Sequence, residues 1–261
     1  MLEYNSNNLS SSSNQYDGKD LKDKLNLRFM DLINKTTCSG SYDMPKVLSP
    51  SHVNIDYLAL YSDRREYTKT GNTCVCFYEY DKAFDCKNGL FNAIYNDDIN
   101  LLSEYKERFK DVLYFISPDY SLCGDMPEIV NVYNIFRSRL VSLGLTLLFD
   151  KLVIPNIAYA SRKSFAYMLD GLEECNAVAF STKGSLKDIN QKELLLEAIK
   201  YTVDHLRNLR QIIIYDVSID NSKTLELFSY ATSKGIEVLI PNNLLKTRNI
   251  ILGGKLNGQI L

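Results

Sequence analysis

Between Val112 and Asn242 the sequence repeats one pattern, a short apolar, β-rich run that ends abruptly in polar residues. The runs are VLYFISPDYS, KLVIPNIAY, AVAFSTKGS, QIIIYDVS and EVLIPNN, and most are separated by a stretch with helical spacing. Alternation of this kind is typical of a mostly parallel α/β sheet with right-handed crossovers. We therefore predict an α/β fold of about five or six strands, arranged either as an open doubly wound sheet or as a small or incomplete barrel.

Residues typical of helix caps mark where several of the helical stretches begin or end. Asp125, followed by Pro127 and Glu128, predicts the start of a helix that Gly144 should end. Ser161, Asp188 with Gln191, and Ser222 predict three further helix starts. The tail RNIILGGKLNGQIL, with its Asn-Gly pair, predicts a terminal hairpin or edge element.

The N-terminal third is less regular. Residues 1–20 are rich in Asn and Ser and have little to bury, so we predict disorder there and a single α/β domain over residues 21–261. In the segment from Leu21 to about Tyr95, LKDKLNLRFMDLI has helical spacing, whereas VNIDYLALY and TCVCFYEY read as strands.

The distribution of charged and apolar residues limits the kinds of partner that the chain can bind. The chain has 30 Lys and Arg against 32 Asp and Glu, interspersed along its length, so it lacks the basic excess of a dedicated duplex-DNA binder. No apolar run is long enough to cross a bilayer, and the N-terminus lacks the order of a signal peptide. We expect a cytoplasmic protein without membrane contact, for which duplex DNA is not the favoured ligand.

The six cysteines are scattered, which favours reduced thiols. Cys74 and Cys76 share one face of a strand near Cys86, a grouping compatible with a metal site but lacking the spacing of a zinc knuckle. Walker, GxGxxG, HExxH and GxSxG motifs are missing from the sequence. We therefore predict no metal and no cofactor.

Polar residues at the ends of parallel strands meet at one edge of a sheet, where α/β proteins bind ligands. We predict catalytic roles there for Asp119, Asp216 and Lys183, and ligand-binding roles for Asn156, Thr182, Gly184, Ser185 and Asn242. The alternatives are an Asx turn at Asp119 and a loop cap at Asp216. The turn STKGS is either an anion cradle for a phosphate or an ordinary polar connection.

Three blocks of sequence resemble a known family. FISPDYSLCGDMPEIVNVYNIFRSRLVSLG, LVIPNIAYASRKSFAYMLDGL and AVAFSTKGS are similar to the domain of unknown function numbered 4417, a group from bacteria, phages and mobile elements. The resemblance runs from about Phe77 to Asp216. It implies a bacterial or phage context and no established activity. It also implies that six positions matter to the shared fold or site: Asp119, Asp125, Pro155, Asn156, Asp170 and Gly171.

Two functions are compatible with these observations. The first is an enzyme acting on a nucleotide, nucleobase or other phosphorylated ligand at the strand ends. The second is a non-catalytic binding or regulatory protein of a mobile element that acts through protein–protein contacts.

Overall fold

The computed structural model describes residues 24–185 and 188–257, the side chains of 253–257 excepted, so the disorder predicted for residues 1–20 lies outside the described part. Apart from a small antiparallel hairpin, β1 (Cys38–Ser39) with β2 (Met44–Pro45), its strands form two parallel sheets. One has the order β10-β3-β4-β5-β6 and the other β7-β8-β9. The bounds of these strands are β3 Tyr57–Leu60, β4 Thr73–Cys76, β5 Tyr114–Ile116, β6 Leu152–Ile154, β7 Ala177–Ser181, β8 Gln211–Tyr215, β9 Glu237–Leu239 and β10 Asn242–Asn243.

The two sheets join at both edges. At one edge Asn156, just beyond β6, forms a parallel bridge with Ala179 of β7. The N–H of Ile157 donates to the carbonyl of Ala179 at 2.9 Å, which reinforces this junction. At the other edge β9 runs on into β10, so that one bent strand pairs first with β8 and then with β3. Of the two predicted architectures, the strands therefore adopt the small barrel.

The barrel interior is filled by side chains. Residues at alternate positions of the strands point inwards, as pairs such as Cys74 with Cys76 and Ile213 with Tyr215 show. Leu58, Ile116, Ile154, Ala179 and Leu239 join them in one apolar cluster. The amino-terminal end of the barrel is closed by the segment before β3, since the Gln211 side chain accepts a hydrogen bond from the N–H of Val53 at 2.7 Å. Within the barrel, the opposite end is the one left open to a ligand.

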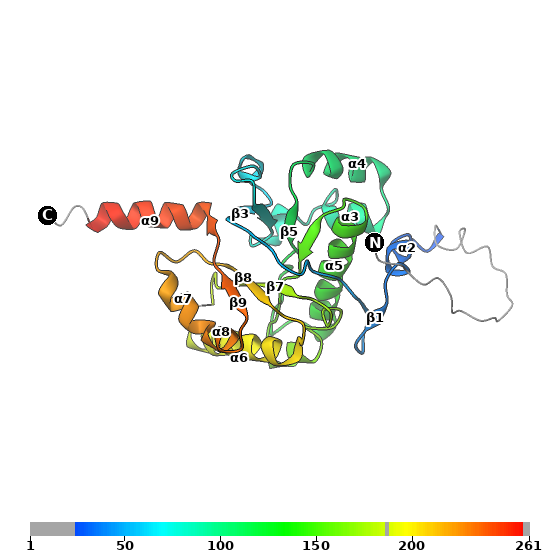
Figure 1. Cartoon of the computed structure of the whole chain (residues 1–261). Helices are drawn as coiled ribbons and strands as arrows, with labels where there is room; N and C mark the ends of the chain where they lie inside the picture. Colours follow the sequence, from blue (N-terminus) through cyan, green and yellow to red (C-terminus); the bar gives the residue numbers. More distant parts are fainter. Residues whose placement is uncertain (1–23, 186–187, 258–261) are drawn as a thin grey trace.

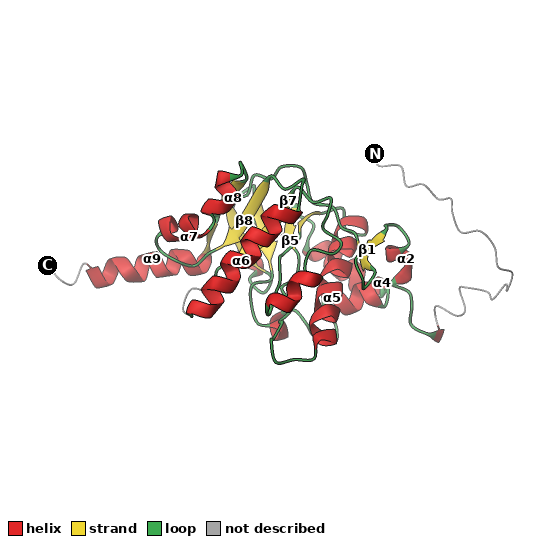
Figure 2. Cartoon of the chain, turned by 90° about the horizontal axis from the view of Figure 1, so that it is seen from below, coloured by secondary structure: helices red, strands yellow, loops and turns green. Residues whose placement is uncertain are grey.

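Helices cover the outside of the barrel in two groups (Figures 1 and 2). The first group packs on β3–β6 and the second on β7–β9. The first consists of α3 (Leu90–Tyr95), α4 (Ile99–Arg108) and α5 (Glu128–Leu147), with the short α2 (Met30–Ile33) against α5. The second consists of α6 (Ile189–His205), α7 (Asn221–Leu227), α8 (Ser229–Ser233) and the 3-10 helix η3 (Arg162–Ala166). Two further 3-10 helices, η1 (Arg64–Glu66) and η2 (Asp81–Ala83), follow β3 and β4.

Two of the predicted helix starts are confirmed. Ser161 begins η3 with a reciprocal capping box, and Asp188 caps α6 by accepting a hydrogen bond from the N–H of Gln191. The start predicted at Ser222 is displaced, because Asp220 accepts the hydrogen bond from the N–H of Ser222 and is itself the cap of α7.

The prediction for Asp125 and Gly144 is wrong. Helix α5 begins at Glu128, and Pro127 has an extended backbone. The helical conformation is sterically disfavoured for the residue before a proline. Met126 precedes Pro127, so a helix that starts from an Asp125 cap is disfavoured. The helix also runs past Gly144 to Leu147. Gly144 serves close packing instead, since a Cβ there would lie 2.4 Å from Cδ1 of Ile94.

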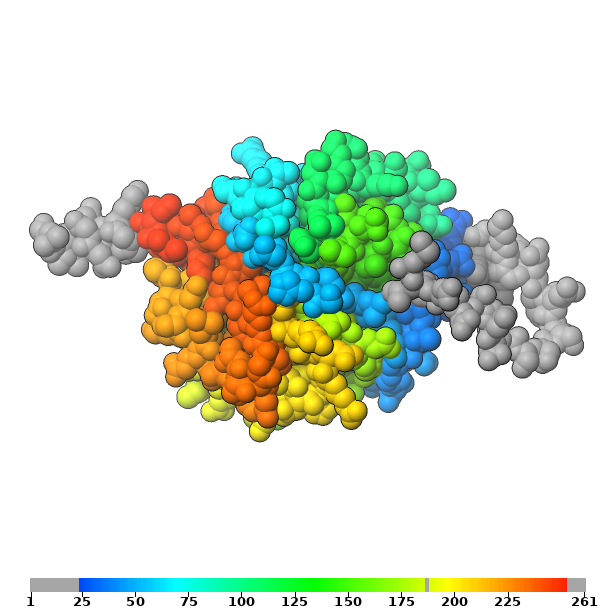
Figure 3. Space-filling model, in the orientation of Figure 1, coloured from blue at the N-terminus to red at the C-terminus, as the bar shows by residue number. Residues whose placement is uncertain are grey.

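The two ends of the described chain also differ from the prediction. Of the helix predicted over residues 21–33, the described part keeps α2 over Met30–Ile33. The predicted C-terminal hairpin is wrong, because residues Leu244–Asn257 form α9. This helix projects away from the barrel, and Ile250, Ile251 and Leu252 are 45%, 54% and 59% exposed (Figure 3). None of the helices in the described ranges combines the length and apolar character needed to cross a bilayer.

Candidate functional site

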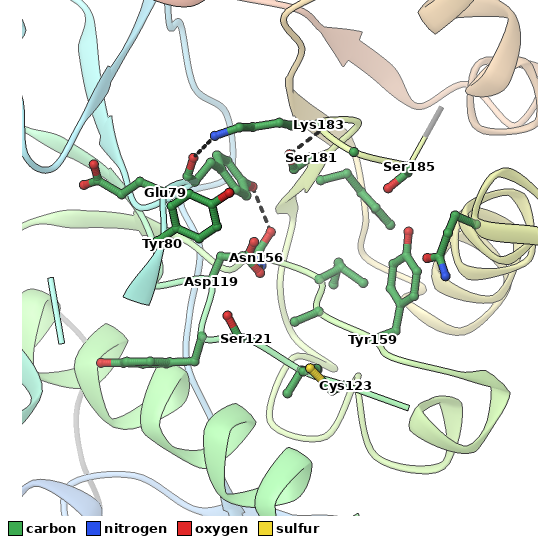
Figure 4. Close-up of a pocket in the computed structure, with 18 residues that line it drawn as sticks. Glu79, Tyr80, Asp119, Ser121, Cys123, Asn156, Tyr159, Ser181, Lys183 and Ser185 are labelled. Atoms are coloured by element: carbon green, nitrogen blue, oxygen red, sulfur yellow. Dashed lines mark hydrogen bonds between the residues drawn. The ribbon is translucent and has the colours of Figure 1, made fainter. Parts of the chain in front are cut away.

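A cleft of about 500 Å³ opens at the carboxyl ends of β4, β5, β6 and β7 (Figure 4). This is the end of a parallel barrel at which active sites are built from the loops that follow the strands. Of the residues that sequence reasoning placed at the strand ends, the structure brings five together in this cleft: Asp119, Asn156, Lys183, Gly184 and Ser185.

The centre of the cleft is a chain of hydrogen bonds between three strand ends. The hydroxyl of Tyr78, beyond β4, donates to Oδ1 of Asn156 at 2.8 Å. Nδ2 of Asn156, beyond β6, donates to Oδ1 of Asp119 at 2.7 Å, and Asp119 follows β5. Asn156 is held in turn by its own N–H, which donates to Oγ of Ser117 at 2.8 Å. Because both ends of the amide are bonded, its orientation is fixed, and with it the position of the Asp119 carboxyl.

Burial raises the pKa of Asp119 to about 6. The hydrogen bond from Asn156 and the charge of Lys183 act in the opposite direction, while the charge of Asp81 adds to the increase. A carboxyl group with a pKa near neutrality can both release and accept a proton under ordinary conditions. Asp119 therefore has the property required of a general acid or base.

Lys183 supplies the positive charge on this part of the wall. Its side chain reaches across from the loop after β7, and Nζ donates to the carbonyl of Tyr78 at 3.0 Å (Figure 4). The side chain is anchored above the Tyr78–Asn156–Asp119 chain and stays exposed on its outer side. Lys183 can thus stabilise negative charge on a ligand without leaving the hydrogen bond that positions it.

The STKGS turn does not have the hydrogen bonding of an anion cradle. The N–H of Lys183 donates to Oγ of Ser181 at 3.2 Å, and the N–H of Ser185 donates to the carbonyl of Thr182 at 3.2 Å. These N–H groups are engaged within the turn and are not presented together to a ligand. Gly184 permits the turn because its φ is +91°, a left-handed value that favours glycine. The geometry is that of a polar connection that carries Lys183.

Three predicted site residues are not brought to the cleft: Thr182, Asp216 and Asn242. Oγ1 of Thr182 donates to Oδ1 of Asp216 at 2.7 Å behind the cleft wall. Asn242 lies in β10, where its Oδ1 accepts a hydrogen bond from the N–H of Asn243 at the start of α9. None of the three lines the cleft in the described part of the chain.

The carboxylate of Asp216 is surrounded by hydroxyl donors. It is buried and accepts hydrogen bonds from Thr182, Ser218 and Thr224. Burial alone would raise its pKa, but these hydrogen bonds outweigh burial and lower it. Asp216 is therefore held ionised and ties the loop after β8 to the loop that carries Lys183.

Sequence reasoning missed the residues contributed by β4. Tyr78, Glu79 and Tyr80 line the cleft on one side, and Tyr159 after β6 lines it on the other. Figure 4 shows Tyr80 and Tyr159 on opposite sides of the Asp119–Asn156 pair. The run TCVCFYEYD has the same form as the later strands, an apolar stretch ending in polar residues, and this signal could have identified Glu79.

The three cysteines that suggested a metal site do not share one environment. Cys74 and Cys76 are buried inside the barrel, and burial raises the pKa of both thiols, whereas Cys86 is exposed. Within the described residues, no group of three or more His, Cys, Asp or Glu side chains is placed to hold a metal ion.

Comparison with known proteins adds a family. The profile of the family described as "Domain of unknown function (DUF4417)" matches residues 36–231. The chain belongs to this family. The match confirms the resemblance seen in the sequence and extends it on both sides, to include β1–β4 and most of the helices around β7 and β8.

Curated relatives of this family member come from phages. The chain is 27% identical over 152 residues to the Gene 1 protein of Mycobacterium phage D29, which covers 56% of this chain and 50% of the relative. It is 26% identical over 173 residues to the Gene 1 protein of Mycobacterium phage L5, which covers 64% of this chain and 68% of the relative. The chain thus spans half the length of the first protein and about two thirds of the second. No solved structure matches it.

Residues that the family resemblance singled out fall into two groups. Asp119, Pro155 and Asn156 belong to the β5 and β6 ends that form the cleft. Asp170 and Gly171 attach the N-terminal hairpin, since the N–H of Gly171 donates to Oγ of Ser39 at 2.8 Å and its carbonyl accepts from the N–H of Val47. Asp125 is exposed and does not line the cleft.

Proposed function

We propose that the protein is an enzyme that carries out acid–base chemistry on a nucleotide, nucleobase or other phosphorylated small ligand in the strand-end cleft. The observation that carries this proposal is the Asp119 carboxyl, which lies in a cleft, is fixed by Asn156 and has a pKa near 6. Perturbed carboxyl groups in clefts are concentrated at catalytic sites. Structural carboxylates such as Asp216 show the opposite behaviour, with a lowered pKa and fully engaged oxygens.

In this reaction Asp119 is the proton donor or acceptor and Asn156 is its positioning residue. Lys183 stabilises negative charge that develops on the ligand, and Gly184 and Ser185 shape the adjoining wall. Asp216 and Thr182 support the loop of Lys183 from behind. The volume of about 500 Å³ is within the range of small-molecule sites.

The test is turnover of a compound panel. The purified chain is incubated with nucleobases, nucleosides, nucleotides and sugar phosphates, and products are detected by mass spectrometry. We expect conversion of at least one compound, a loss of about 10²- to 10⁴-fold in Asp119→Asn, and a melting temperature within a few degrees of the wild type. Asp111→Asn, at an exposed carboxylate outside the cleft, is the matched control and should retain full activity. Equal turnover by Asp119→Asn would remove Asp119 from the mechanism.

A second function, protein–protein binding without catalysis, is favoured by one observation. Helix α9 projects from the body and exposes Ile250, Ile251 and Leu252 in succession, an apolar surface that a partner would cover (Figure 1). Self-association is the form tested first, by sedimentation over a range of concentrations. We expect association in the wild type that Ile251→Glu abolishes. A chain that stays monomeric throughout, with no turnover of the panel, would leave neither function supported.

A further inference from the structure

We propose that the cleft binds an aromatic base of the adenine or cytosine type, with its ring between Tyr80 and Tyr159 and its amino edge on Asp119. This inference rests on the proposed function for the position of the binding site, which is the strand-end cleft. It concerns which ligand binds there and does not require that the ligand is converted.

The first support is the exposed ring of Tyr80. Tyr80 is 82% exposed although it lines the cleft, while its neighbour Tyr78 is 2% exposed. A tyrosine ring at a cleft rim offers a flat apolar face to which an aromatic ring can stack. Its position directly after β4 and the buried Tyr78 fixes the backbone that carries it.

The opposite wall presents a second aromatic ring. Tyr159 follows β6 and is partly buried against the core around α6. Burial and the charge of Asp119 both raise the pKa of Tyr159. The Tyr159 hydroxyl is therefore close enough to the Asp119 carboxyl for the two charges to interact. In Figure 4 the Asp119–Asn156 pair lies between Tyr80 and Tyr159. A planar ring entering the cleft between them therefore has a tyrosine on each side and a carboxyl at its edge.

The charges in the cleft disfavour a phosphate as the group bound most deeply. The Asp119 carboxyl faces the cleft, against the single cation Lys183 among the described residues that line it, while the Glu79 carboxylate is turned outwards and accepts hydrogen bonds from Ser62. Nζ of Lys183 already donates to a backbone carbonyl. Asp188 caps the first turn of α6 with its own carboxylate, so this helix start is occupied as well. A neutral or cationic group meets less repulsion here than a dianion does.

Asp119 recognises the amino edge of the base by hydrogen bonding. One carboxyl oxygen accepts the hydrogen bond from Asn156, which leaves the second lone pair of that oxygen and the whole of the other oxygen for a ligand. Adenine and cytosine carry an amino group beside a ring nitrogen. An ionised carboxylate accepts from the amino group and from the protonated ring nitrogen of such a base, which present two donors side by side. Hypoxanthine and uracil place a carbonyl oxygen beside their ring N–H, so they offer an ionised carboxylate one donor and one repelling acceptor.

The experiment is titration calorimetry on the full chain with four nucleosides and one phosphate. Adenosine and cytidine are the expected ligands, inosine and uridine test the amino edge, and ribose 5-phosphate tests the phosphate alternative. We expect binding of adenosine or cytidine that is at least tenfold tighter than that of the other compounds.

Variants of Tyr80 test the stacking. Tyr80→Leu should weaken binding about 5- to 150-fold, the range measured for loss of one base–aromatic stack. Tyr80→Phe should stay within about twofold of the wild type because it keeps the ring. Tyr42→Leu, the same change at a tyrosine that is 47% exposed on the β1–β2 hairpin, is the matched control and should have no effect.

Three results would overturn the inference. They are absence of binding by adenosine and cytidine, binding of ribose 5-phosphate that Tyr80→Leu leaves intact, and equal affinities for the amino and carbonyl bases. The two proposals fail separately. Base binding without turnover refutes the enzyme and retains the inference, whereas turnover of a sugar phosphate lacking a base does the reverse.

Discussion

Substitution of Gly144 by alanine measures how closely α5 approaches α3. A Cβ at this position would lie 2.4 Å from Cδ1 and 2.8 Å from Cγ1 of Ile94, which is 1% exposed and has little room to move. Two effects compete. Alanine in a helix interior is favoured over glycine by about 0.8–1.0 kcal/mol, whereas overpacking a core costs about 1–3 kcal/mol. We therefore expect Gly144→Ala to lower the free energy of unfolding by about 1 kcal/mol.

The cause can be separated by a double-mutant cycle. Ile94→Val removes the Cδ1 atom and costs about 0.5–1.5 kcal/mol by itself. In that background the contact with a γ carbon remains, so Gly144→Ala should cost less than in the wild type, with a coupling energy of about 0.5–1 kcal/mol. The measurement is urea unfolding followed by circular dichroism, with the midpoint compared at constant slope. If Gly144→Ala instead stabilised the wild-type protein by about 0.8–1.0 kcal/mol and showed no coupling to Ile94→Val, the close approach of α5 to α3 would be refuted.

Three further predictions concern stability and protonation. Asp216→Ala leaves the hydroxyls of Thr182, Ser218 and Thr224 without their acceptor, so the free energy of unfolding should fall by about 3 kcal/mol. Since the pKa of Asp216 is lowered on folding, its stabilising contribution is present above the ordinary carboxyl pKa and is lost in acid as the pH falls through the folded value. Acid unfolding of the wild type and the variant should therefore converge at low pH. For Asp119, whose pKa is raised to about 6 from 3.8, the ionised form disfavours folding, so its destabilising contribution grows as pH rises between about 4 and 6. Asp119→Asn should accordingly gain stability relative to the wild type at pH 8 but not at pH 4, and a carboxyl titration by NMR with a midpoint below 4.5 would contradict this reasoning. Gly171→Ala combines a φ of +82° with a Cβ 2.6 Å from the carbonyl of Pro45, and should cost about 2 kcal/mol more than Gly184→Ala, where the space around the Cβ is open. Equal melting temperatures for the two glycine variants would count against that close contact.

Local sequence patterns predict the strands and half of the candidate site well. The runs AVAFS and QIIIYD match β7 and β8, and the polar residues after β5, β6 and β7 do converge in one cleft. These features depend on apolar periodicity and on the rule that parallel strands end at a common edge, both of which act over short stretches of chain.

Closure of the barrel could not be predicted in this way. It depends on β10 pairing with β3, residues almost two hundred positions apart in the chain, and on the single bridge between Asn156 and Ala179. Neither contact leaves a local pattern. Asp216 was misleading for a related reason. It stands at a strand end like Asp119, and the hydroxyls that occupy it come from the loop after β7, from its own loop and from helix α7.

The predicted helix ends were wrong where one preference of the chain opposes another. Asp125 is a good cap residue, but the steric restriction before Pro127 prevents the helix from starting there. The Gly and Asn residues of the tail favoured a hairpin, yet Leu244–Asn257 forms a helix, and Oδ1 of Asn243 caps it by accepting from the N–H of Lys246. Asn243 is in turn tied to the barrel, because its Nδ2 donates to the carbonyl of Asp216 at 2.7 Å, and a tertiary contact of this kind overrides the weak preference of the local sequence.

The bent strand formed by β9 and β10 has a consequence for how the chain is made. Until residues 237–243 have left the ribosome, β8 and β3 both present an unpaired edge, because this segment covers one with each of its halves. Open parallel edges are prone to pair with other chains. The edge of β3 therefore stays open from early in synthesis and that of β8 only for a short final stretch, and the same segment covers both.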